Sequence, residues 1–94
     1  MTELLPRHKV RIAYDSMINY QYAAWPKKSS WKSKPSIVLN KGEWIDHDYY
    51  LFKSIDGYEY RVYMDLDTKN VGFSIKSVEV WKQGKQVYHE SVYE

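Results

Sequence analysis

The residues best suited to contact a partner lie in the ten-residue segment Trp25 to Lys34, which holds two indoles, four lysines and no acidic residue. Indole rings can stack on bases while ammonium groups neutralise phosphates, as binding of single-stranded nucleic acid requires. The alternative is that the two indoles cover one end of the fold and the lysines only solvate a loop. The segment is a candidate site for single-stranded nucleic acid or an oligosaccharide, with Trp25, Lys27, Lys28, Trp31, Lys32 and Lys34 as its residues.

A second candidate surface depends on a predicted hairpin at Asp56-Gly57, which stands between two runs of aromatic and β-branched residues. Both central positions of a type I′ turn need positive φ, which Gly adopts freely and Asp tolerates. A two-residue turn there pairs Ile55 with Tyr58 and places Arg61 opposite Phe52. Tyr and Arg are enriched at protein interfaces, whereas ordinary cross-strand pairing is the alternative. We therefore expect a protein-binding patch made of Tyr50, Phe52, Arg61 and Tyr63.

The same register places Asp48 directly opposite Asp65. Like charges opposite each other destabilise a sheet, and a bound Ca²⁺ or Mg²⁺ would relieve the repulsion. If both residues lie at frayed strand ends, solvation of their side chains explains the pair without a metal. We therefore expect no metal, with a cation site at Asp48 and Asp65 as the alternative. The three histidines are scattered along the sequence, and no phosphate-binding, nucleophile or zinc motif occurs.

These observations favour a small non-catalytic binding protein, with no cofactor, that acts on a macromolecule through an aromatic and basic surface. We expect a protein partner first, and single-stranded nucleic acid or an oligosaccharide second. A Cys-free, aromatic-rich chain of 94 residues is also typical of small inhibitors and immunity proteins from phages or mobile elements.

The elements that must position these residues are strands. From Asp48 to Tyr93 the pattern predicts a four-strand meander, with Leu66 paired to Val71 across a polar turn at 67–70. The alternation changes phase after Ile75, which predicts a β-bulge near Lys76-Ser77. A turn at Gln83-Gly84 would then set His89 opposite Val78.

The first half of the chain is less regular. Residues 1–7 read as an irregular leader, and 8–14 alternate as a strand. Residues 18–25 also alternate, which favours a strand over a helix at 15–25. The Pro-bracketed, Lys- and Ser-rich stretch 26–35 predicts a loop, followed by a short strand at 36–39.

The predicted fold is therefore all-β: one small antiparallel barrel or sandwich of six or seven short strands, the size of an SH3-like or OB-like domain. An α+β fold with a short helix near 15–25 is the alternative. The expected core consists of Val10, Ile12, Tyr60, Val62, Met64, Phe73 and Ile75.

Composition limits the remaining possibilities. The net charge of +2 is too small to indicate nucleic acid by itself. The chain has no Cys, which fits the cytoplasm. It has no apolar stretch long enough for a signal peptide or a membrane span.

Overall fold

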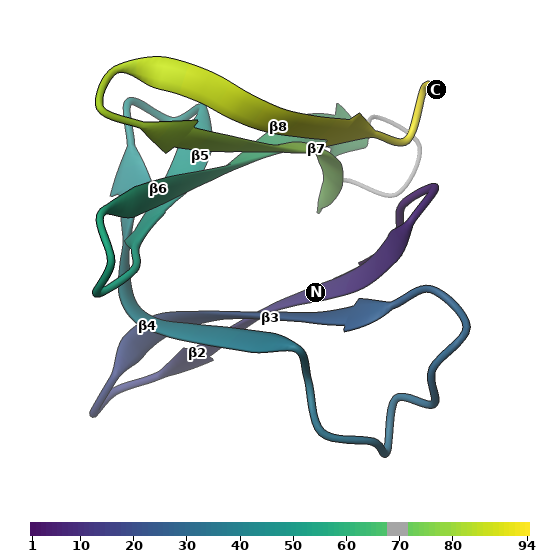
Figure 1. Cartoon of the computed structure of the whole chain (residues 1–94). Helices are drawn as coiled ribbons and strands as arrows, with labels where there is room; N and C mark the ends of the chain where they lie inside the picture. Colours follow the sequence, from purple (N-terminus) through teal and green to yellow (C-terminus); the bar gives the residue numbers. More distant parts are fainter. Residues whose placement is uncertain (68–71) are drawn as a thin grey trace.

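The computed structural model describes residues 1–67 and 72–94, which form eight antiparallel strands and no helix. Each strand pairs with the next in chain order, so the sheet is a meander that curls into a half-barrel (Figure 1). The all-β prediction is confirmed, although the strand count is higher than expected. The strands are β1 (Thr2–Leu4), β2 (His8–Asp15), β3 (Asn19–Pro26), β4 (Ile37–Ile45), β5 (Tyr49–Lys53), β6 (Tyr58–Asp67), β7 (Gly72–Lys82) and β8 (Lys85–Ser91).

The predicted irregular leader is wrong, because it contains β1. Thr2 pairs with Arg11 and Leu4 with Lys9, and the following Leu5 is fully buried in the core. A three-residue strand is too short to show alternation, so its pairing partner β2 decides its conformation. The strands expected at 8–14 and 18–25 are confirmed as β2 and β3.

β4 joins the two layers of the half-barrel, passing from β3 to β5 (Figure 1). Its pairing with β3 shifts register by one residue where Lys41 adopts a φ of 59°, which marks a bulge that bends the strand. The next residue is Gly42, where any Cβ would overlap the Phe52 ring. The short strand expected at 36–39 is therefore the first part of a longer, bent one.

The β5–β6 hairpin differs from the prediction by one residue. Lys53 pairs with Glu59, and the backbone N–H of Ser54 donates to the carbonyl oxygen of Tyr58 at 2.9 Å. The loop therefore has three residues, 55–57, instead of the two of the predicted Asp56-Gly57 turn. The Ser54 hydroxyl accepts a hydrogen bond from Tyr58 N at 3.0 Å and donates to the Asp56 carboxylate, and Gly57 has a φ of 92°. A three-residue loop ending in a left-handed Gly is the second common hairpin geometry.

A one-residue slip moves every side chain of a strand to the other face. Phe52 therefore pairs with Tyr60 and is fully buried, while Ile55 stands fully in solvent at the loop tip. Tyr50 pairs with Val62 and likewise points into the half-barrel.

The β6–β7 pairing keeps the predicted faces, although its register differs. Leu66 pairs with Phe73 instead of Val71, a shift of two residues that preserves the alternation. The predicted bulge is confirmed at Lys76, because Met64 pairs with Ile75 and Tyr63 with Ser77. The turn expected at 67–70 lies mostly outside the described residues.

The β7–β8 hairpin turns at Gln83-Gly84 as predicted, with φ values of 51° and 77°. A bulge at Val87 then shifts the register, because Trp81 pairs with Gln86 and Val80 with Tyr88. His89 therefore lies opposite Glu79 on the outside of the sheet, which corrects its expected position opposite Val78.

The core lies between the two layers. Four expected members are buried, whereas Tyr60 and Met64 are half-buried at its edge and Phe73 lies outside the residues whose side chains are described. No helix in the described residues is long and apolar enough to cross a membrane. The buried core residues predicted correctly are Val10, Ile12, Val62 and Ile75, and the structure adds Leu5, Tyr22, Ala24, Phe52 and Val78.

Candidate binding sites

The loop after β3 presents its lysines to solvent, as the sequence predicts: Lys27, Lys28, Lys32 and Lys34 are all exposed. The two indoles differ. Trp31 is 39% exposed, whereas Trp25 is 1% exposed, which corrects the expectation that both rings face a partner.

Trp25 instead anchors the loop. Its indole Nε1 donates a hydrogen bond to the carbonyl oxygen of Ser33 at 2.8 Å. The Trp31 ring packs edge-on against it, with the ring centroids 5.1 Å apart. The loop therefore folds back over the outer side of β2 and β3, with Trp31 held in a defined position.

Two cations from β2 extend this surface. Lys9 and Arg11 alternate with the inward-facing core residues of their strand, so they point outward. Lys9 Nζ lies 5.0 Å from the Trp31 ring centroid, and the Arg11 guanidinium lies 5.0 Å from that of Trp25. The alternation of residues 8–14 places these two cations on the polar face of a strand, but a local pattern does not show that this face meets the loop.

We call this region the basic surface. None of its six cations forms an ion pair within the described parts of the chain. Its residues are Lys9, Arg11, Lys27, Lys28, Trp31, Lys32 and Lys34.

The predicted protein-binding patch is only partly assembled. Arg61 and Tyr63 lie on the outer face as expected, whereas Tyr50 and Phe52 are turned inward by the hairpin register. The Arg61 guanidinium lies 4.5 Å from the Trp81 ring centroid and 5.6 Å from that of Tyr49. The outer face thus carries an Arg61 stack, formed by Tyr49, Arg61, Tyr63 and Trp81.

The expected opposition of Asp48 and Asp65 does not occur. The backbone N–H of Met64 donates to the carbonyl oxygen of Asp48, and Asp65 pairs with Ser74 on β7. The Asp65 carboxylate accepts a hydrogen bond from the Tyr93 hydroxyl. No cluster of three or more His, Cys, Asp or Glu among the described residues could hold a metal ion.

The concave side of the half-barrel contains a cavity of about 470 Å³ that sequence analysis did not predict. Aliphatic side chains and four tyrosines form most of its wall, and among the described residues Glu90 is the one acidic residue that lines it. Burial raises the pKa of the Tyr22 phenol, with Tyr60 and Glu90 nearby adding to the effect. We call this the concave cavity; its polar lining includes His8, Tyr22, Tyr58, Tyr60, Tyr88 and Glu90.

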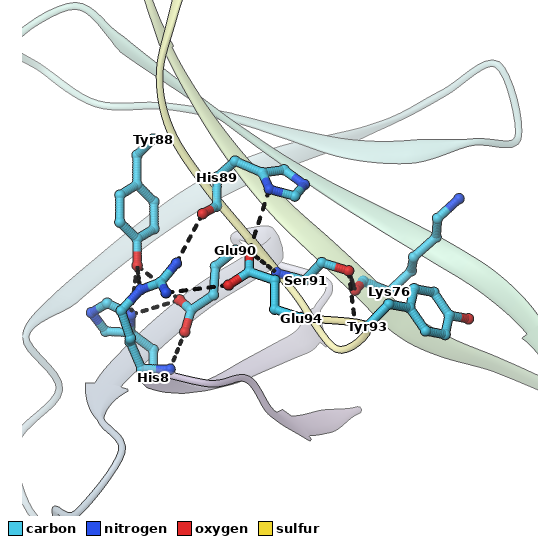
Figure 2. A network of polar contacts seen from close by, with 9 residues as sticks. His8, Lys76, Tyr88, His89, Glu90, Ser91, Tyr93 and Glu94 are labelled. Atoms are coloured by element: carbon cyan, nitrogen blue, oxygen red, sulfur yellow. Dashed lines mark hydrogen bonds and ion pairs between the residues drawn. The ribbon is translucent and has the colours of Figure 1, made fainter.

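Glu90 is the centre of a polar network that links the two ends of the sheet (Figure 2). Its side chain is 2% exposed, and one carboxylate oxygen lies 2.7 Å from His8 Nδ1 and accepts a hydrogen bond from the Tyr88 hydroxyl at 3.1 Å. The other oxygen accepts the backbone N–H of Arg7.

The Arg7 side chain completes this network on its exposed side. Its guanidinium donates to the Tyr88 hydroxyl at 2.9 Å and to the carbonyl oxygen of His89 at 3.0 Å, and it pairs with Glu94 at 3.2 Å. The corner between β1 and β2 is thereby fastened to β8. A sequence signal for this inward face existed, because Tyr88, Glu90 and Val92 alternate.

Comparison with models of protein families, with curated proteins and with solved structures finds no match for this chain.

Proposed function

We propose that this protein is a non-catalytic binding protein whose basic surface binds single-stranded nucleic acid. The observation that carries the proposal is that the six cations of the basic surface form no ion pair with any described residue, and that they lie on the loop of the partly exposed Trp31 and on the outer face of β2 beside it. Cations of this kind attract phosphates by displacing condensed counterions, and an exposed indole offers a face to one base.

We now place single-stranded nucleic acid before a protein partner, which reverses the order expected from the sequence. The protein-binding patch lacks two of its four members, because Tyr50 and Phe52 point into the half-barrel. The basic surface loses only Trp25 and gains Lys9 and Arg11. Because Trp25 and Ser33 fix the position of Trp31, binding would require little ordering of the ring.

A protein partner remains the second candidate, supported by the Arg61 stack. Tyr, Trp and Arg dominate the binding energy of many protein interfaces, and three of these side chains lie stacked on the outer face. We also propose, from the sequence, that the protein is cytoplasmic and is encoded by a phage or a mobile element.

Fluorescence anisotropy with a labelled oligo(dT) tests the proposal. We expect saturable binding that weakens with salt, and a salt slope reduced by roughly 0.7 for each lysine removed in the double variant Lys32→Gln/Lys34→Gln. The matched control is Lys53→Gln/Lys85→Gln, which removes the same charge from exposed lysines outside the basic surface. If the salt slope falls equally in both variants, the oligonucleotide is attracted only by the net charge of the protein and the basic surface is not its binding site.

Trp31→Ala separates binding from folding. We expect it to lose about 1–3 kcal/mol of oligonucleotide affinity, the usual contribution of a stacked ring. If it instead lowers only the melting temperature, Trp31 acts as a cover for Trp25. Wild-type protein that ignores oligo(dT) at low salt would contradict the proposal, and salt-independent binding of an oligosaccharide would replace it.

A further inference from the structure

The concave cavity has the dimensions of a small-molecule site. Its volume of about 470 Å³ lies within the range of roughly 300–1,000 Å³ found for ligand pockets. Like those pockets, it has mostly apolar walls with a few polar groups. Six strands contribute to the lining: β2, β3, β4, β6, β7 and β8.

The most informative group in this cavity is the carboxylate of Glu90. A buried carboxylate must be compensated by hydrogen bonds or by a positive charge. Two of its donors, the Arg7 backbone N–H and the Tyr88 hydroxyl, carry no charge. Among the described residues His8 is its one ion-pair partner, and the Arg7 guanidinium binds other atoms.

The carboxylate also retains the capacity to accept another hydrogen bond. Two carboxylate oxygens offer about four acceptor positions, and three are used, two on one oxygen and one on the other. Because Glu90 lines the cavity, a ligand that donates a hydrogen bond from a charged group could use the fourth position.

The tyrosines that line the cavity also favour a cationic ligand. The face of an aromatic ring attracts a nearby cation. This molecule already contains one such contact at the cavity, where Lys82 Nζ lies 4.3 Å from the Tyr58 ring centroid. The rings of Tyr22 and Tyr60, 5.7 Å apart, form a further aromatic wall.

We propose that the concave cavity binds a small organic amine, whose ammonium group donates to the Glu90 carboxylate while its aromatic or branched body packs among the tyrosines. This inference is independent of the proposed function. The cavity lies on the inner side of the sheet, and the basic surface lies on the outer side of β2 and β3.

Calorimetry with three probes of one shape tests the charge of the ligand: 2-phenylethylamine, 2-phenylethanol and phenylacetate. The ammonium and the hydroxyl can both donate to the carboxylate, but only the ammonium adds an opposite charge, so the alcohol should bind roughly 10-fold more weakly than the amine. Phenylacetate should bind most weakly, because its charge repels that of Glu90. Equal binding of phenylacetate and the amine, or saturable binding by none of the probes, would overturn the proposal.

Glu90→Gln tests the position of the charge. It keeps the shape and one acceptor oxygen, so we expect it to bind the amine no more tightly than the alcohol. The matched control is Glu79→Gln, which removes the same charge from the outer face of β7, where Glu79 accepts a hydrogen bond from Trp81. If both variants discriminate between the probes as the wild type does, Glu90 is not the binding group.

A third variant tests the location without altering the polar network. Ile37 is half-buried and lines the cavity from β4, so Ile37→Phe should reduce binding of both the amine and the alcohol by filling space. This result decides the location even if Glu90→Gln fails to fold, which its melting curve will show. Unchanged binding in Ile37→Phe would place the amine elsewhere and refute the proposal.

Discussion

Tyr22 illustrates how this small core accommodates a polar group. The side chain is buried between Phe52 and Tyr60, with ring centroids 5.6 and 5.7 Å away. Burial raises the pKa of its phenol because the charged phenolate would lose its hydration. Burial also raises the pKa of Tyr60 and of Tyr50, so several phenols resist ionisation in the folded state.

This burial predicts alkaline unfolding. The pKa of Tyr22 is higher in the folded than in the unfolded chain, so its contribution to stability is complete below the usual phenol pKa of 10 and is lost as the pH rises above it. Tyr22→Phe removes this titration, and we expect its alkaline midpoint, followed by circular dichroism, to move to higher pH.

The control for this experiment is Tyr14→Phe, which removes an exposed hydroxyl. Its alkaline midpoint should equal that of the wild type. If Tyr22→Phe and the wild type unfold at the same pH, ionisation of Tyr22 does not drive the transition.

Among the elements, β4 is the bent strand that joins the two layers of the half-barrel (Figure 1). It pairs with β3 up to Gly42 and with β5 from Glu43 onward, and the bulge at Lys41 lies just before this change of partner. Phe52 fills the space beside Gly42, so the bend and the core are packed against each other.

Gly42→Ala should therefore destabilise the protein. The added methyl group would overlap the Phe52 ring, and overpacking a core typically costs about 1–3 kcal/mol of unfolding free energy. Urea unfolding measures this loss. Adding Phe52→Leu removes the overlapping atoms, so the double variant should lose less than the sum of the two single variants. Strict additivity would show that the two residues do not interact.

At the scale of the whole molecule, the network around Glu90 fastens the first strands to the last one (Figure 2). β1 also lies against β7, so both ends of the sheet meet on the same side of the half-barrel. An open curled sheet would otherwise have two free edges, and the network joins them next to the concave cavity.

Glu90→Ala should open this junction. It removes the charged acceptor of the Arg7 N–H and the Tyr88 hydroxyl, and a hydrogen bond to a charged group contributes about 1.5–3 kcal/mol. Hydrogen exchange should show the loss of protection first in β1 and β8. Glu94→Ala removes the exposed ion pairs with Arg7 and His89 and the acceptor of the Ser91 N–H, but leaves the Glu90 network intact, so we expect a smaller loss of protection. Equal effects of the two variants would mean that Glu90 does not hold the ends together.

The sequence by itself determined the features that depend on neighbouring residues. Period-2 alternation predicted strands at 8–14 and 18–25, and the loss of phase after Ile75 predicted the bulge at Lys76. The prolines around the Lys-rich segment predicted an exposed loop, because proline lacks the N–H that central pairing requires. Each of these signals is contained within a few consecutive residues.

Only the tertiary structure decided which faces and which distant residues meet. Two hairpin loops fit Asp56-Gly57, and the three-residue loop places Phe52 beside Gly42 in the core. The leader becomes a strand because β2 offers it an edge. Glu90 is buried because Arg7 and His8, more than eighty positions away, supply its donors. Burial of a carboxylate depends on partners brought together by the whole sheet, and local pattern contains no information about them.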